Sequence, residues 1–432
     1  MGNITGSKVG QVKSRVGFGT ESYIGLTVVL ILLAGLIGGS VWASHHGGTI
    51  KIGILGPMTG SRAQIGGDIK AGFEIYLKEA NNMMAGKKVE LVIEDSGKPT
   101  TSIAKARKLI NHDNVDVMAG LFSSSNAYAV APLANEVNLP LVITGSAGDN
   151  LTQRKRSANI TRVNVCGSQA GHTAADYAYK QLGWRKVSII GWEHAFGQET
   201  LGSFHKAFED LGGKVVQRTY IPRKTLDFSP YVANLDRKVD GLFAVVTGAP
   251  NIRFLRALRS RGLMNSWKVL TVLSATDESF LQEMGAIGDG VLSVNSYSTV
   301  LDTPENAKFI ELVKKSTDRE ASGVMMDAYV GAKWIAMAAE AVKGNVKDRV
   351  AFNKALHSVS MKNSPHGMLK LDEYGQATQN IYVRRVDKVN GRWQNTVIFT
   401  YPNVSQFGPY DPATYLKSPT YGPDHPACTN CK

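Results

Sequence analysis

The sequence predicts an α/β protein built from two doubly wound, Rossmann-like parallel sheets. From Thr49 onward, short apolar runs alternate with longer amphipathic stretches, and this βαβαβ rhythm is typical of a parallel sheet covered by helices on both faces. The rhythm restarts after Cys166, which divides the chain into two similar halves. The chain has 432 residues, 43% of them hydrophobic, so each half can bury a core of its own.

The first half opens on the buried strand "TIKIGIL", residues 49–55. The stretch 66–82 then places Ile69, Phe73 and Leu77 at helical spacing. The same reading continues along the chain, with strands expected at 87–95, 115–120 and 139–145, and helices at 100–113 and directly after the serine run 123–125.

The second half repeats this alternation. The amphipathic stretch 197–212 ends at Gly212. Glycine is the residue preferred at the position that follows a helix C-terminus. Other helices are expected at 170–183, 229–237, 251–262 and 323–344, and strands at 185–192, 214–221, 240–248, 267–273 and 290–297. From Tyr401 onward, prolines, tyrosines and glycines follow without a period, which predicts an irregular strap over the surface.

The N-terminus indicates export. Basic residues precede the uncharged run Ile24–Val41, whose length lies between a signal-peptide core and a membrane-spanning helix of ~20 residues. Small or β-branched residues up to Ala43 suit a secretory cleavage site. Residues 1–43 are therefore predicted to be a signal peptide, with an uncleaved membrane anchor and a buried core helix as alternatives. The protein is expected in the periplasm or elsewhere outside the cytoplasm.

Cysteine use and charge restrict the possible partners. Cys166 is expected to be a small core residue, and Cys428 with Cys431 to form a local disulfide rather than half of a metal site. The net charge of +13 is spread along the chain, without an arginine-rich tract or zinc-finger spacing. We therefore expect no nucleic-acid partner, but a surface suited to an anionic ligand or an anionic membrane face.

Motifs for catalysis and cofactor binding are missing from the sequence. The first strand is followed by "GPMTGSRAQIGG", which has neither the GxGxxG of dinucleotide binding nor a phosphate-binding P-loop. "GLFSSSN" is not the GxSxG of a hydrolase, and nothing in the sequence pairs His194 with a serine. The prediction is a protein that is not an enzyme and takes no cofactor.

Polar loops instead follow the strands at their C-terminal ends, where open α/β sheets bind ligands. The serine run Ser123, Ser124 and Ser125 follows one strand, and "TGSAGDN" follows the next. The N–H groups at a helix N-terminus attract anions, and hydroxyls add donors without adding charge. The alternative is that Ser124 or Ser125 caps the helix while the other serines face water.

Five segments occur in register over most of the exported chain. They are "GPMTGSRAQIGGDIKAGFEIYLKE", "FSSSNAYAVAPLANEVNLPLVITGSAGDNLT", "DYAYKQLGWRKVSIIGWEHAFGQE", "LDFSPYVANLDRKVDGLFAVVTGAPNIRFLRALRSRG" and "YSTVLDTPENAKF". Together they resemble the type I periplasmic binding proteins, the solute receptors of ABC importers related to the leucine/isoleucine/valine-binding proteins, in the branch that binds amino acids or aromatic acids. The likeness covers residues 50–416.

The resemblance implies two lobes joined by three hinge crossovers, with the solute in the cleft between them. The implied lobes are 48–165 with 298–369, and 166–297 with 370–432. The ligand-binding positions carried over from the family are Ser123, Ser124, Ser125, Ser146, Ala147, Gly148, the lid Phe196, and Arg62, Gln64, Ile65 and Thr276.

Two positions depart from the family pattern. The loop "LSATDES" should supply an acidic residue for a solute ammonium, but the aligned position falls on Ser274, Ala275 or Thr276, with Asp277 adjacent. Gly148 stands where relatives often keep a threonine. These departures favour a carboxylate solute without an amino group.

The implied function is capture of a small carboxylate-bearing solute and its delivery to the membrane permease of an ABC importer. The alternatives are a ligand-binding sensor that acts through a separate signalling partner, and an enzyme on a similar scaffold.

Overall fold

The computed structural model describes residues 10–11 and 48–431. The chain divides into two units, Met1–Gly48 and Thr49–Lys432, and both predicted sheets belong to the second. Apart from residues 10 and 11, the predicted signal peptide or anchor lies outside the described residues. In the part of the chain that the structure describes, no helix combines the length and apolar character needed to cross a membrane.

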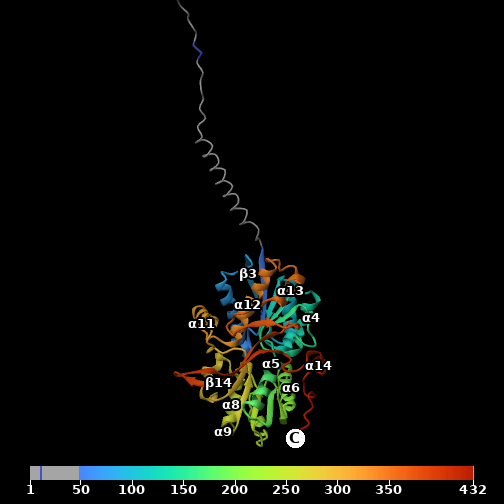
Figure 1. The fold of residues 1–432 in the computed structure, drawn as a ribbon, viewed down its shortest axis with the longest axis vertical. Coiled ribbons are helices and arrows are strands. Elements are labelled where there is room, and N and C mark those ends of the chain that lie inside the picture. The colour runs from blue at the N-terminus through green and yellow to red at the C-terminus, as the bar shows by residue number, and fades with distance from the viewer. Residues whose placement is uncertain (1–9, 12–47, 432) are drawn as a thin grey trace, which may run out of the picture. The chain divides into compact units, whose positions relative to one another are not determined.

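A first sheet organises one lobe (Figure 1), with strand order β2-β3-β1-β4-β5-β6. Its pairs are parallel except β2 with β3. The strands are β1 Thr49–Gly56, β2 Met83–Met84, β3 Lys87–Asp95, β4 Val117–Gly120, β5 Leu141–Ile143 and β6 Ile160–Arg162. The helices of this lobe are α2 Ala63–Glu79, α3 Pro99–Asn111, α4 Ser124–Glu136, α11 Pro304–Ser316, α12 Gly323–Ala341 and α13 Arg349–Ser358.

A second sheet organises the other lobe, with strand order β12-β13-β14-β11-β10-β9-β7-β8 and β15 paired to β14. The strands are β7 Lys186–Trp192, β8 Lys214–Ile221, β9 Gly241–Val245, β10 Lys268–Val272, β11 Leu292–Asn295, β12 Ser360–Met361, β13 Leu369–Leu371, β14 Ala377–Val389 and β15 Arg392–Val404. The helices are α5 Gly167–Lys180, α6 Ala195–Asp210, α7 Ser229–Ala233, α8 Pro250–Ser260, α9 Leu263–Ser266, α10 Glu278–Met284 and α14 Pro412–Lys417.

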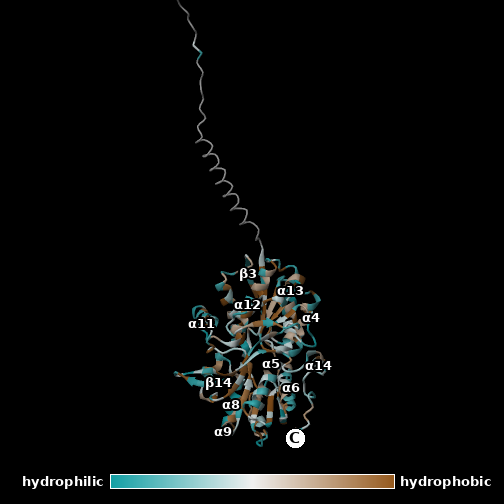
Figure 2. Ribbon diagram, in the orientation of Figure 1, coloured by the Kyte–Doolittle hydropathy of each residue, from teal (hydrophilic) through white to brown (hydrophobic). Residues whose placement is uncertain are grey.

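Apolar strands covered on both faces form the cores. Ile50, Ile52 and Ile54 of β1 are fully buried, as a central parallel strand requires. Figure 2 shows the hydrophobic residues concentrated in the strands of both sheets. Helix α12 packs on α2 at Gly72, where a Cβ would lie 2.4 Å from the carbonyl oxygen of Met325. The late helix therefore lies in the first lobe, although the strands before it in the sequence belong to the second.

The predicted alternation of strands and helices is confirmed, and some boundaries move. The helix expected at 66–82 begins at Ala63 and ends at Glu79. The irregular segment expected from Tyr401 is only partly irregular, because β15 continues to Val404 and α14 interrupts the strap. The Cys428–Cys431 disulfide is present, and Cys166 is buried with a free thiol, both as expected. The residue-level lobe boundaries stay a prediction.

Candidate functional site

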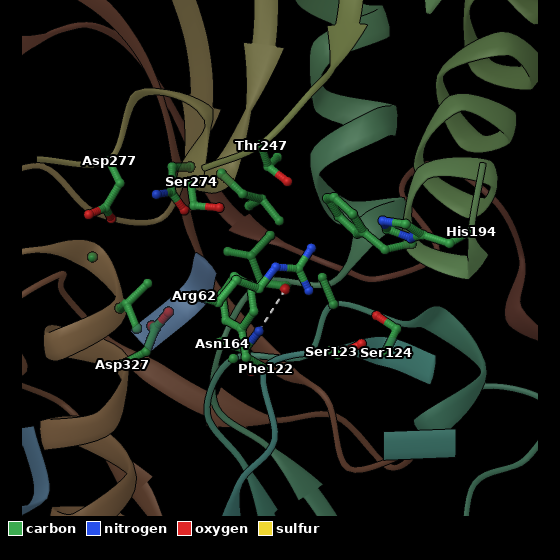
Figure 3. Close-up of a pocket in the computed structure, with 18 of the residues that line it drawn as sticks. Arg62, Phe122, Ser123, Ser124, Asn164, His194, Thr247, Ser274, Asp277 and Asp327 are labelled. Carbon is green, nitrogen blue, oxygen red and sulfur yellow. Dashed lines mark hydrogen bonds between the residues drawn. The ribbon is translucent and has the colours of Figure 1, made fainter. Parts of the chain in front are cut away.

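A cavity of about 690 Å³, measured with its opening to solvent, lies between the lobes. The first lobe lines it with the loops after β1, β4, β5 and β6 and with the start of α12. The second lobe lines it with the loops after β7, β8, β9 and β10 and with the end of β11. These loops follow the C-terminal ends of parallel strands, as the sequence predicted. The close-up in Figure 3 shows polar side chains from both lobes directed into this space.

The serine run begins helix α4 at the edge of the cavity. Ser123 is the N-cap residue by its backbone angles, φ −79° and ψ 124°, but its side chain makes no capping hydrogen bond. The Ser146 hydroxyl donates to the Ser124 hydroxyl at 3.3 Å, and both residues are buried. Ser123 and Ser124 line the cavity, whereas Ser125 does not. The hypothesis that Ser124 or Ser125 caps the helix is wrong, because the N-cap position falls on Ser123.

One side of the cavity is positively charged. Burial and the neighbouring Arg223 lower the pKa of Arg62 to about 10. Burial, with Arg223 and Arg62, lowers the pKa of His194 to about 3, so this imidazole is neutral at pH 7. Within residues 48–431, neither guanidinium has a carboxylate within 4 Å. The two arginines come from opposite lobes and leave an uncompensated positive charge that an anion can neutralise.

The other side of the cavity is acidic. Figure 3 places Asp277 and Asp327 on one side of Arg62 and Phe122, with His194 and the serines on the other. Burial and the nearby Asp277 raise the pKa of Asp327 well above its ordinary value. The Oδ1 atom of Asp327 is buried and has no hydrogen-bond partner among the described residues. Burial therefore favours the protonated form of Asp327, and its carboxyl offers an unused polar group to a ligand.

The predicted site residues separate into three groups. Arg62, Ser123, Ser124, Ala147 and Phe196 line the cavity. The residues directly behind this lining are Ser146, bonded to Ser124, and Gly148, whose Cβ position lies 2.9 Å from the Ser124 Cβ. The remaining predicted positions, which do not line the cavity, are Ser125, Gln64, Ile65 and Thr276.

Three of these outlying positions have evident structural contacts. The Gln64 side-chain amide donates to the Ser279 carbonyl at 3.1 Å and so links the lobes. Ile65 is buried beside a wider chamber that adjoins the cavity. The Thr276 hydroxyl donates to the Ser293 hydroxyl at 2.8 Å inside the second lobe. The acidic residue next to Thr276 in the same loop is Asp277, and Asp277 lines the cavity.

The sequence reasoning missed Asp327, Arg223 and His194 as lining residues. Asp327 is an acidic residue in the largely buried helix α12, and a charge within "GVMMDAYVG" is the signal that could have indicated it. The described residues contain no group of three or more histidine, cysteine or acidic side chains placed to hold a metal ion.

Comparison with known proteins shows the family of this chain. The family model for periplasmic binding proteins matches residues 49–392. A Leu/Ile/Val-binding protein homolog 6 from Brucella melitensis biotype 1 is 31% identical, over 83% of this chain and 93% of the relative.

Solved structures with the same fold include receptors for two kinds of solute. A solute-binding protein of an ABC transporter from Rhodopseudomonas palustris HaA2, in complex with p-hydroxybenzoic acid, is 33% identical, with a TM-score of 0.79 over 83% of this chain and 99% of that one. A leucine-binding protein from Thermotoga maritima MSB8 is 25% identical, with a TM-score of 0.73 over 82% and 99%. This chain is a member of the periplasmic binding protein family, with the two-lobed type I fold of ABC-transporter substrate-binding proteins.

Proposed function

We propose that the protein captures a small aromatic carboxylate in the cleft between its lobes and delivers it to an ABC permease. The observation that carries this proposal is the polarity of the cavity. Arg62 and the serine loop face one end, two aspartates face the other, and the rings of Phe122 and Phe196 contribute apolar walls. Such a site fits a flat apolar body with an anionic group at one end.

The carboxylate belongs at the arginine and serine end. There it accepts hydrogen bonds from the hydroxyls of Ser123 and Ser124 and neutralises the charge of Arg62. Closure brings His194, Thr247 and the rest of the second lobe over the solute, so that the closed form presents both lobes to the permease. Gly148 then acts behind the serines, and Gln64 acts through its contact with Ser279 of the other lobe.

The acidic end suits a hydroxyl group on the far side of the solute. Asp277 can accept from a hydroxyl, and Asp327, whose protonated form burial favours, can donate to the same oxygen. Receptors of this fold hold p-hydroxybenzoic acid and 3,4-dihydroxybenzoic acid at 33% and 29% identity to this chain. Both observations support a hydroxylated aromatic acid.

An α-amino acid is the second candidate, because an ammonium group could sit against Asp277 and Asp327. The two candidates differ in proton balance. A hydroxyl leaves the proton on Asp327, whereas an ammonium favours its ionised form and releases that proton.

Calorimetry separates these candidates. Titrations of benzoate, 4-hydroxybenzoate and leucine are run in two buffers with different ionisation enthalpies. The proposal expects 4-hydroxybenzoate to bind most tightly, to raise the melting temperature, and to show the same enthalpy in both buffers. Binding of leucine alone, with a buffer-dependent enthalpy, would replace the aromatic acid by an amino acid.

The N-terminal segment decides how the receptor is held outside the cytoplasm. Cleavage after about residue 43 would free it into the periplasm, and retention of 24–41 would anchor it. N-terminal sequencing of the mature protein distinguishes a new terminus from the original one.

A further inference from the structure

A second, wider chamber opens from the cavity toward solvent. It encloses about 1730 Å³, again with its opening. The side chains at the boundary between the two spaces line both of them, namely Arg62, Phe122, Ser123, Arg223, Thr247 and Ser274. A solute held by the serine loop can therefore extend past the two arginines into the outer chamber.

The outer chamber is strongly basic. Among the described residues that line it, the cationic side chains are Arg62, Lys98, Arg223, Lys224 and Arg253. The one acidic side chain in the same set is Asp95, and its oxygens already accept hydrogen bonds from the backbone N–H groups of Met58 and Gly97 and from the hydroxyl of Thr59. The acceptor that could offset the basic groups is thus already engaged.

The cations converge from both lobes without counter-ions. Arg62 and Lys98 belong to the first lobe, whereas Arg223, Lys224 and Arg253 belong to the second. Within residues 48–431, none of the five has a carboxylate within 4 Å. A concave surface of one sign attracts an ion of the opposite sign, and the attraction is larger where the walls exclude water.

The charge at the boundary exceeds what a single carboxylate neutralises. Arg62 and Arg223 repel each other across the cleft, and this repulsion contributes to the lowered pKa of Arg62. One carboxylate at the serine loop offsets one of the two guanidinium charges. The second guanidinium and the cations beyond it face the outer chamber.

We propose that the outer chamber is a second anion-binding subsite and that the preferred solute carries two anionic groups. One carboxylate lies at the serine loop, and the other lies beyond the arginine pair, near Lys98 and Arg253. This inference rests on the proposed function, because it needs an acid already held in the inner cavity.

The test compares matched solutes by calorimetry. Benzylsuccinate, with two carboxylates, is titrated against 4-phenylbutyrate, with one, and phthalate, whose second carboxylate is adjacent to the first, is titrated against benzoate. Of the two dianions, we expect the one that binds more tightly to exceed the affinity of its monoanionic partner about tenfold at low salt. This advantage should shrink as salt screens the exposed charges.

Variants locate the effect. K98Q/R253Q should reduce the dianion advantage to about threefold or less while leaving monoanion affinity nearly unchanged, since each exposed charge contributes modestly. The matched control K88Q/K268Q removes the same net charge from exposed residues at the opposite, N-terminal ends of β3 and β10, and should keep the advantage.

The outcomes separate the two proposals. If monoanions bind and neither dianion gains, or if the gain persists in K98Q/R253Q, the second subsite is wrong and the proposed function stands. If no aromatic acid binds, with one or two carboxylates, the proposed function fails and the subsite with it. If the dianions associate faster than the monoanions but do not bind more tightly, the second subsite is also wrong.

Discussion

The hydroxyl of Tyr128 donates to the carboxyl group of Glu199 across the boundary between the lobes, at 2.8 and 3.0 Å from its two oxygens. Tyr128 is on α4 of the first lobe and Glu199 on α6 of the second. The same carboxyl accepts from the backbone N–H of Asp149 at 2.7 Å and from the side-chain amide of Asn150 at 3.3 Å. This interlobe contact stabilises the arrangement in which the cavity is formed.

Replacing Tyr128 with phenylalanine should therefore weaken solute binding. The change removes the donor to Glu199 and also the acceptor for the Asn150 N–H. One such buried bond is worth about 0.5–1.5 kcal/mol, so we expect affinity to fall about two- to tenfold. Calorimetry measures the loss. Tyr231→Phe, on α7 away from the cleft, is the control that should bind normally. Equal affinities in the two variants would mean that the contact does not stabilise the closed cleft.

The stability that Glu199 contributes should fall as pH rises from about 6.5 to 8.5. Burial and the neighbouring Asp149 raise the pKa of Glu199 to about 8, from an ordinary value of 4.5. A raised carboxyl pKa stabilises the folded protein fully below the unfolded value, and this contribution is lost as pH rises through the folded value. Burial lowers the pKa of His172, His194 and His366, so these histidines oppose the trend near pH 6.5, where an ordinary imidazole is half protonated. Their effect is the same in the wild type and in a Glu199 variant and cancels when the two are compared.

Melting temperatures at pH 6.5, 7.5 and 8.5 measure this loss in the wild type and in Glu199→Gln. Glutamine keeps the shape and cannot ionise, so its curve should be flatter. Asp68 and Glu278 also have pKa values raised to about 7, chiefly by burial, and leave some slope in the variant. Parallel curves for the two proteins would contradict the assignment to Glu199.

Local patterns predicted the parts of the site that depend on chain order. Apolar runs marked the strands, and the serines that follow one of these strands in sequence, Ser123 and Ser124, line the cavity. This works because parallel strands end at one edge of a sheet, so the loops after them are brought together whatever their exact geometry.

Contacts between distant segments could not be predicted in this way. Asp327 faces the cavity only because the chain returns from the second lobe to the first, where α12 packs on α2. A charged side chain is not expected in a core, yet Arg384 of β14 is fully buried. Its burial is possible because Glu278 and the Tyr297 carbonyl accept hydrogen bonds from it. Such partners are supplied by the tertiary fold and leave no local signal.

The serine run offers a test with a control built into the sequence. Ser123→Ala should lower solute affinity about tenfold or more, since a hydrogen bond to a charged group contributes about 1.5–3 kcal/mol. Its melting temperature without solute should stay close to that of the wild type, because the Ser123 side chain caps nothing. Ser125→Ala makes the same chemical change outside the cavity and should bind normally. If the two variants bind alike, the carboxylate does not lie on the serine loop.

Gly148 should not tolerate threonine. A Cβ at this position would lie 2.6 Å from the Tyr128 hydroxyl oxygen and 2.9 Å from the Ser124 Cβ, closer than such atoms approach in folded proteins. Gly148→Thr must therefore displace Tyr128 from Glu199, and we expect lower stability, by about 1–3 kcal/mol, together with weaker binding. Shortening the neighbour in Gly148→Thr/Tyr128→Ala removes the closest clash, so this double variant should be destabilised by less than the sum of its two single changes. Melting temperatures and denaturant midpoints of the four proteins give the coupling. Strict additivity would show that the threonine is accommodated without moving Tyr128.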